Sequence, residues 1–366
     1  MKDVKIFGMY LPQYHRIPEN DKFWGEGFTD WVAVKNAESL YPGHDQPRVP
    51  YEDNYYDLSD PKCLKWQAEL AKEYCVSGWG IYHYWFSSEH VLLTKPAEII
   101  LANKDIDIPF FFAWDNISWR RTWSKLTGNA WSPKADELAE NKSGPEILVE
   151  YKLGREDEWT KHFDYLLPYF SDDRYIKRDN KPVFIVFNYD EKILEMNQYW
   201  DKLAKEHGFS GMEIIFKNDP LHVPNTVEAF SYEPQYSGWL GIKDRTIGRI
   251  KTHLVKDKPL IFSYDTVWKK ILKNARKNSN ALQWHGAFVG YDDTPRRGTR
   301  GRILEGGTPE KFGKYLDQLV KICEDQGKEF VFITAWNEWG EGAYLEPDKK
   351  TGFGYLEAIK KVMTKE

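Results

Sequence analysis

Two glutamates near the C-terminus are the residues of this sequence best suited to chemistry. Glu338 and Glu341 follow an apolar run at 330–335 and are separated by Trp339 and Gly340. Two carboxyl groups on one short turn can face the same cavity, where desolvation and mutual repulsion push their pKa values apart. One group then holds a proton while the other accepts one, as glycosidic bond cleavage requires. The residues alone leave a second interpretation open, in which both glutamates occupy the first turn of a helix and favour its positive end.

The elements that must position this pair can be read from hydrophobic periodicity. Short apolar runs rich in Ile, Val, Phe and Tyr predict strands. There are eight such runs, at 4–10, 78–84, 108–114, 182–187, 212–216, 229–232, 286–290 and 330–335. Helical patterns lie between several of them, at 61–74, 159–167, 198–207 and 309–326. Alternation of strands and helices over this length favours a (β/α)₈ barrel.

Two connections are much longer than ordinary loops. They cover 11–60, after the first predicted strand, and 115–154, after the third. Barrels build their active sites from the loops at the carboxyl ends of the strands. Because we find no internal repeat and no linker, we expect a single barrel domain over 1–366 with long βα loops.

Polar and aromatic side chains stand at most of the predicted strand ends, and all would face one mouth. Each has an ordinary structural alternative: an acid at a strand end is more often a cap or turn residue, and His83 alone is more often a hydrogen-bonded histidine than a ligand. The candidates for substrate binding are Tyr10, Tyr14, Asp30, Trp31, His83, Trp85, Trp114, Asp115, Asn188, Glu233, Asp292, Trp336 and Asn337.

Composition excludes several classes of function. The net charge of −5 and the lack of a dense Lys/Arg run argue against nucleic acid as a partner. No segment has the apolar length of a membrane span, so we expect a soluble, cytoplasmic protein. The three cysteines lack metal-type spacing, and no HxH, HExxH or DxD pattern organises the acids and histidines. We therefore expect no metal and no cofactor.

Aromatic residues make up 16% of the chain, with 16 Trp, 22 Tyr and 20 Phe. Most Phe are expected in the core, but many Trp and Tyr lie at strand ends beside polar residues. Aromatic faces edged by polar groups suit sugar rings, which stack through their C–H faces and hydrogen-bond through their hydroxyls. We expect Trp31, Trp85, Trp114 and Trp336 to form a sugar platform, with Asp30, His83, Asp115 and Asp292 holding hydroxyls.

Six segments carry a resemblance to a known family over nearly the whole chain. They lie at 10–21, 25–31, 82–86, 174–182, 290–298 and 335–347. The chain resembles the WbsX-like glycosyltransferase/hydrolase family, which is related to glycoside hydrolase family 99. In that family a motif similar to Asn337-Glu338-Trp339-Gly340-Glu341-Gly342 carries both catalytic carboxylates on a (β/α)₈ barrel.

The resemblance implies a retaining mechanism without a covalent enzyme intermediate. Glu338 would remove the proton from the sugar's own 2-hydroxyl, which attacks the anomeric carbon to give a 1,2-anhydro sugar, while Glu341 would protonate the departing oxygen. An ordinary retaining pair instead uses a carboxylate as the nucleophile. One departure affects the segment after the third strand, where Ile117 replaces an acid usual in the family; this predicts a changed substrate specificity, with Asp115 as the compensating residue.

The sequence predicts an endo- or exo-acting retaining glycosidase for an oligosaccharide or polysaccharide, in particular a bacterial surface or capsular polysaccharide. A glycosyltransferase of polysaccharide assembly is the first alternative, and a non-catalytic carbohydrate-binding barrel is the second. A transferase needs groups that grip phosphate. The arginines at 296, 297, 300 and 302 form the cluster available for this, although such a Gly-rich charged loop is more typically solvated.

Overall fold

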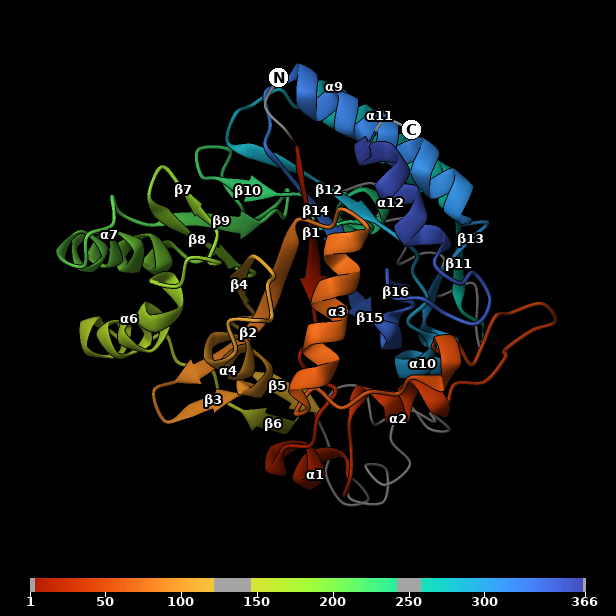
Figure 1. Ribbon diagram of the computed structural model, residues 1–366, viewed down its shortest axis with the longest axis horizontal. Coiled ribbons are helices and arrows are strands. Elements are labelled where there is room, and N and C mark those ends of the chain that lie inside the picture. Colours follow the sequence, from red (N-terminus) through yellow and green to blue (C-terminus); the bar gives the residue numbers. More distant parts are fainter. Residues whose placement is uncertain (1–3, 122–145, 242–257, 365–366) are drawn as a thin grey trace.

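Eight parallel strands close into a barrel in the computed structural model, which describes residues 4–121, 146–241 and 258–364 (Figure 1). The strand order follows the sequence, and pairing of the first strand with the last and with the second completes the ring. The barrel strands are β1 (Lys5–Tyr10), β2 (Gly78–Ser87), β4 (Phe110–Trp114), β8 (Lys181–Val186), β9 (Glu213–Lys217), β10 (Ala229–Phe230), β12 (Gln283–Phe288) and β14 (Phe330–Thr334). The predicted fold class is confirmed, and each of the eight predicted runs contains or overlaps one barrel strand.

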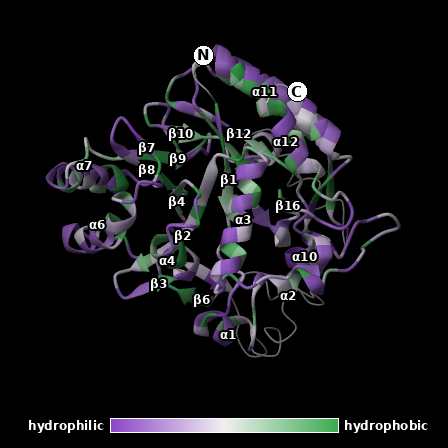
Figure 2. Cartoon of the chain, viewed as in Figure 1, coloured by the Kyte–Doolittle hydropathy of each residue, from purple (hydrophilic) through white to green (hydrophobic). Residues whose placement is uncertain are grey.

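Helices surround the barrel, and several of them begin at a side-chain cap. They are α3 (Pro61–Glu73), α4 (Lys95–Ala102), α6 (Glu156–Phe170), α7 (Glu191–Glu206), α9 (Tyr264–Lys277), α11 (Pro309–Asp325) and α12 (Gly354–Thr364). The Thr308 hydroxyl accepts a hydrogen bond from Lys311 N at the start of α11, and Asp60 caps α3 through Lys62 N. Both α3 and α11 show alternating apolar and polar bands, as expected for helices that cover a barrel (Figure 2).

The barrel interior is packed with aromatic rings. Phe7 of β1 lies 5.3 Å from Phe111 of β4 and 6.2 Å from Phe332 of β14, between ring centroids. Phe230 of β10 closes this layer against Phe332 at 4.9 Å. Side chains alternate between the inside and the outside of each barrel strand. This alternation therefore decides which strand-end side chains enter the mouth.

The two long connections carry secondary structure of their own. The segment after β1 forms α1 (Pro18–Trp24), α2 (Asp30–Lys35) and η1 (Tyr51–Asp53). The described part of the connection after β4 forms the hairpin strands β5 (Trp119–Arg121) and β6 (Glu146–Val149). The connection after β12 holds α10 (Thr294–Arg297), η3 (Gly298–Arg300) and β13 (Arg302–Glu305), which pairs with β11 (Leu260–Ser263). The remaining elements are β3 (His90–Leu92), β7 (Lys177–Arg178), η2 (Tyr236–Leu240), β15 (Asn337–Glu338), η4 (Trp339–Glu341) and β16 (Ala343–Tyr344).

Gly286 offers a test of barrel packing. A Cβ atom at this position of β12 would lie 1.8 Å from the carbonyl oxygen of Ser231, which belongs to the chain just beyond β10. Since backbone cannot move as a side chain can, we expect G286A to lower the free energy of unfolding by about 2–3 kcal/mol, measured by chemical denaturation. The matched control is G238A, whose Cβ would meet only the Val267 side chain at 3.9 Å. Equal stability of the two variants would contradict this account of β12 packing.

Candidate active site

The turn after β14 is fixed by Asn337. Its side chain accepts a hydrogen bond from Leu11 N at 2.7 Å and donates one to Leu11 O at 3.0 Å, which ties the turn to the chain leaving β1. The Tyr14 hydroxyl lies 2.6 Å from the Asn337 carbonyl oxygen and accepts a hydrogen bond from Trp339 N at 3.2 Å. The backbone on both sides of Glu338 is therefore held by the first loop.

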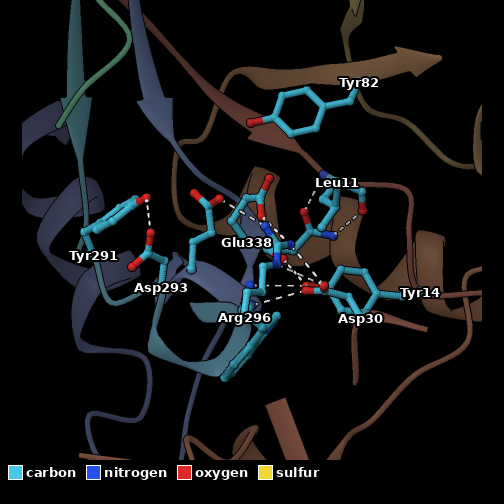
Figure 3. A network of polar contacts seen from close by, with 12 residues as sticks. Leu11, Tyr14, Asp30, Tyr82, Tyr291, Asp293, Arg296 and Glu338 are labelled. Atoms are coloured by element: carbon cyan, nitrogen blue, oxygen red, sulfur yellow. Dashed lines mark hydrogen bonds and ion pairs between the residues drawn. The ribbon is translucent and has the colours of Figure 1, made fainter. Parts of the chain in front are cut away.

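A buried guanidinium joins the two glutamates. Arg296 of α10 donates through Nη2 to Glu338 Oε2 at 3.1 Å and through Nη1 to Glu341 Oε1 at 3.0 Å. Its Nη2 and Nε also donate to Asp30 Oδ1, at 3.0 and 3.3 Å. Figure 3 shows Arg296 between Asp30 and Glu338. Three carboxylates are thus held by the charge-assisted hydrogen bonds of one planar guanidinium, which fixes their positions relative to one another.

Gly340 makes this arrangement sterically possible. A Cβ atom there would lie 2.6 Å from Arg296 Nε and 2.7 Å from Asp30 Oδ2. The Gly340 N–H donates to Asp30 Oδ2 at 3.2 Å. The glycine between the two glutamates thus lets the guanidinium approach the turn. The turn itself is a three-residue 3₁₀ helix, η4, with Glu338 at its N-cap and Glu341 as its last residue. The alternative in which both glutamates lie at the start of a helix therefore applies to this single turn, which leads directly into β16.

Burial dominates the electrostatics of Glu338. It raises the pKa of this carboxyl to about 8; the charge of Arg296 acts in the opposite direction, and Glu341 and Asp30 add to the rise. An ionised carboxylate in such surroundings is a stronger base than one in water. The Glu341 side chain is more accessible, at 17% exposed against 7% for Glu338.

Aromatic and charged groups line the barrel mouth beside the pair. The hydroxyls of Tyr82 and Tyr232 lie 2.7 Å apart, and burial, followed by their mutual interaction and the charge of Glu338, raises the pKa of Tyr82. The Lys217 ammonium lies 5.0 Å from the ring centroids of both Phe187 and Tyr232. Burial lowers the pKa of Lys217, whereas the charges of Asp115 and Glu341 raise it.

Asp115 is the predicted residue that belongs to this mouth. Burial raises its pKa to about 6, against the effect of the Lys217 charge. Among the described residues we find no hydrogen bond to its carboxylate and no ion pair with Lys217. Both groups are therefore available to a ligand in the described part of the chain.

Asp292 supports the turn and does not face the mouth. Its carboxylate accepts hydrogen bonds from the Thr294 hydroxyl at 2.6 Å and from Gln46 Nε2 at 2.7 Å, and it lies 3.0 Å from His44 Nε2. Its N–H donates to Glu341 O at 2.6 Å. With its oxygens occupied in this way, Asp292 positions the Glu341 backbone, and the expectation that it holds sugar hydroxyls is corrected.

The four tryptophans expected to form a sugar platform are packed inside the protein. Trp31, Trp85, Trp114 and Trp336 are at most 5% exposed. Trp85 stacks on His162 of α6 at 4.3 Å, and Trp31 lies 4.5 Å from Tyr14 and donates through Nε1 to Tyr56 O. The structure does not bring these ring faces to the mouth, because they lie on the outward side of the strands or behind the turn that carries Glu338 and Glu341.

Four other candidates also lie apart from the glutamates. Tyr10 donates to Gln67 of α3 at 2.7 Å, and His83 Nε2 lies 2.9 Å from His162 Nε2. Asn188 pairs with Asn116 through its backbone N–H at 2.8 Å. Glu233 accepts hydrogen bonds from the N–H and hydroxyl of Ser237 at 2.9 and 2.6 Å. The structure thus gathers Tyr14, Asp30 and Asn337 at the pair, and Asp115 at the mouth.

The sequence did not reveal the inward tyrosines or the central arginine as site residues. In β2 the residues predicted to bind substrate are His83 and Trp85, but Tyr82 and Tyr84 are the ones that lie on the inner face of the barrel. Consistent alternation along the strand could have found them, because Gly80 on the same face packs against Phe111 in the interior. Arg296 was assigned to a solvated loop, which is wrong, since it is 7% exposed.

Comparison with known proteins places the chain in a family. The profile described as "Glycosyltransferase WbsX" matches residues 6–359. The chain belongs to this WbsX family. The "Uncharacterized protein WxcX" of Xanthomonas campestris pv. campestris is 27% identical over 373 residues, which cover 98% of this chain and 50% of that protein. The chain thus spans about half the length of the curated relatives it matches.

Solved structures with this fold include glycoside hydrolases. The GH99 endo-alpha-mannosidase from Bacteroides thetaiotaomicron superposes with a TM-score of 0.56 and 14% identity, over 100% of this chain and 98% of the other. A "Glycoside hydrolase-like protein" superposes with a TM-score of 0.59 and 12% identity, over 99% and 94%. The expected relationship to family 99 is confirmed at the level of the fold.

Two further observations concern the described residues alone. In these parts of the chain, no group of three or more His, Cys, Asp or Glu side chains is arranged to hold a metal ion. Across the same ranges, every helix is too short or too polar to cross a bilayer.

Arg296 can be tested as the group that favours ionised Glu338. We expect R296M to raise the pKa of Glu338, because the removed cation stabilises the carboxylate; the ¹³C signal of the Glu338 carboxyl, followed against pH, measures this. Stability should fall by about 3–5 kcal/mol, since buried carboxylates lose their counter-ion. R297M is the control, because Arg297 is paired with Asp293 on the same helix. A Glu338 titration unchanged in R296M would contradict this role.

Proposed function

We propose that the chain is a retaining glycoside hydrolase that cleaves a bacterial surface or capsular polysaccharide. The observation that carries this proposal is the pair Glu338 and Glu341, held by one guanidinium at 3.1 and 3.0 Å. Beside the pair lies a mouth of inward tyrosines with Lys217 and Asp115. Membership of the WbsX family, the GH99-like fold and the bacterial relative support a carbohydrate substrate.

The two glutamates would take different roles in cleavage. Glu338 would accept the proton of the sugar's 2-hydroxyl as its oxygen attacks the anomeric carbon, and Glu341 would donate a proton to the departing glycosidic oxygen. The bond from the anomeric carbon to the leaving group breaks as the 1,2-anhydro ring forms. Water then opens that ring, giving its proton to Glu341, while Glu338 returns a proton to the 2-oxygen. Each of the two steps inverts the configuration of the anomeric carbon, so the product retains the configuration of the substrate.

The surroundings suit these roles. Glu338 is the deeper carboxyl with a raised pKa, so its ionised form is a strong base, and Arg296 limits the rise. Glu341 lies closer to the surface, where a leaving group exits and water enters. Tyr14, Asp30 and Arg296 hold both groups so that little reorganisation is needed during the reaction.

A transferase is the second candidate, because the family is described as a glycosyltransferase. In the same site an acceptor hydroxyl could replace water when the 1,2-anhydro ring opens. A nucleotide-sugar donor would instead need cations that grip phosphate, and Arg296 is already engaged with three carboxylates. Thermal stabilisation by oligosaccharides but not by nucleotide sugars would support the hydrolase. Products in which the sugar has been transferred to an added acceptor, and not to water, would support the transferase.

The role of Glu341 can be tested with two leaving groups. We expect E341Q to lower kcat/KM by about 10²–10⁴-fold on an unactivated oligosaccharide but much less on the matching aryl glycoside, because only the former leaving group needs a proton. E338Q should lose activity on both. The first substrates are α-mannosides, chosen from the GH99 endo-alpha-mannosidase of the same fold. Equal losses of E341Q on both substrates would remove Glu341 from the acid role, and unchanged activity in both variants would place the catalytic groups elsewhere. Binding of the oligosaccharide without cleavage by the wild type would favour a binding barrel.

The route through the 2-hydroxyl can be tested with a 2-deoxy substrate. We expect the 2-deoxy aryl glycoside to bind but not to be cleaved, because the nucleophile of the first step is missing. A carboxylate nucleophile would still cleave it, losing only the hydrogen bonds that the 2-hydroxyl makes in the transition state. The 2-deoxy compound has a more labile glycosidic bond, so a loss of activity cannot come from lower reactivity. A glycosyl ester trapped on Glu338 would refute the proposed route.

A further inference from the structure

A second buried glutamate lies directly behind the catalytic turn. Glu346 follows β16 and is 3% exposed. Its Oε1 accepts hydrogen bonds from Gln67 Nε2 at 2.6 Å and Trp336 Nε1 at 3.1 Å. Its Oε2 accepts hydrogen bonds from the Tyr56 hydroxyl at 2.8 Å and Trp339 Nε1 at 2.7 Å. Four donors therefore converge on one carboxylate.

These donors connect Glu346 to the proposed base. Trp336 and Trp339 flank the dipeptide Asn337-Glu338 on its two sides. Tyr56 reaches the same dipeptide, because its hydroxyl also accepts a hydrogen bond from Asn337 Nδ2 at 3.3 Å. A change in the position of Glu346 would thus be passed to both ends of the dipeptide that carries Glu338.

The charge of Glu346 has no cationic partner within 4.0 Å among the described residues. Burial raises its pKa to about 7, and the hydrogen bonds from Trp339, Tyr56, Gln67 and Trp336 act in the opposite direction. A buried carboxylate balanced only by neutral donors is costly to keep in a core. An apolar side chain would fill the space at a lower cost in folding free energy, but it could not accept hydrogen bonds and so could not fix the orientation of the two indole rings.

We propose that Glu346 is a positioning residue that orients Glu338 through the indole N–H groups of Trp336 and Trp339. The kinetic part of this proposal rests on the proposed function, whereas the effect on Glu338 itself does not.

The geometry makes Glu346→Gln a sharp test. An amide NH₂ must replace one of the two carboxylate oxygens, and each oxygen faces one indole N–H. Gln67 can turn its amide and Tyr56 can rotate its hydroxyl to accept, but an indole N–H can only donate. In either orientation, one tryptophan therefore faces a second donor and must move.

The measurement that needs no substrate is the ¹³C titration of the Glu338 carboxyl by NMR. We expect its midpoint to rise in E346Q, because a displaced turn weakens the contact of Glu338 with Arg296. We also expect the indole ¹⁵N–H signals of Trp336 and Trp339 to titrate together near neutral pH in E338Q, which removes the Glu338 carboxyl. In E338Q/E346Q, which keeps Asp30 and Glu341, this titration should disappear. The other ionisable groups facing Glu346 are Tyr10, Tyr56 and Cys63, and burial raises the pKa of each.

The measurement on substrate separates positioning from binding. We expect E346Q to lower kcat at least tenfold with KM within about twofold, because a misoriented base affects the reacting state more than the bound state. The double variant W336F/E346Q should recover part of kcat, since the NH₂ group can then face the side without an indole donor.

E213Q is the matched control. Glu213 is also a buried glutamate with a pKa raised by burial, to about 7, but it lies at the opposite end of the barrel with Arg178 and Glu228. It should keep kcat and the Glu338 titration of the wild type.

Distinct outcomes separate this inference from the proposed function. If E346Q folds, as judged by its denaturation midpoint, and leaves the Glu338 titration unchanged, Glu346 does not position Glu338. If E346Q does not fold, the same measurement is made on W336F, and an unchanged Glu338 titration in W336F would overturn the proposal. A wild-type protein that cleaves no glycoside but shows the expected shift in E346Q would remove the proposed function alone.

Discussion

The contact of Arg296 with three carboxylates is the constraint on which the site depends. Asp30 comes from the first loop and Glu338 and Glu341 from the turn after β14, and the three carboxylates would repel one another if they met without a cation. The guanidinium fits because it presents several donors in a fixed plane, and because Gly340 leaves it room. One positive charge among three acids leaves an excess of negative charge. This excess adds to burial in raising the pKa of Glu338, so its ionised form is a stronger base.

Two loops far apart in sequence supply the groups that hold this arrangement. The segment after β1 contributes Tyr14 and Asp30, and the segment after β12 contributes Asp292 and Arg296. The barrel by itself fixes only the positions at which its strands end. Long loops are therefore needed to carry side chains across the mouth and onto the turn after β14.

Aromatic residues serve different purposes according to their depth. Phe rings fill the interior layer, inward tyrosines line the mouth, and most strand-end tryptophans hold the outer surface of the barrel to its helices. Trp336 and Trp339 have a further use, because their N–H groups both reach Glu346. The indole N–H fixes the orientation of each ring through its hydrogen bond, while the ring itself contributes buried apolar area.

The barrel and its pair of glutamates follow from local patterns in the sequence. Alternating apolar runs and helical patterns are local signals, so all eight barrel strands could be located, and the acid pair follows from two glutamates placed after the last strand. Tyr14, Asp30 and Asn337 are also among the residues expected at the site, but as substrate-binding groups; the structure shows them holding the turn and Arg296. Which side of a strand each residue takes emerges from the folded barrel: one residue of offset separates Tyr82 in the mouth from His83 against α6. The fold also determines that Arg296 is buried and that Glu346 collects four donors, because each depends on contacts between segments that no local pattern connects.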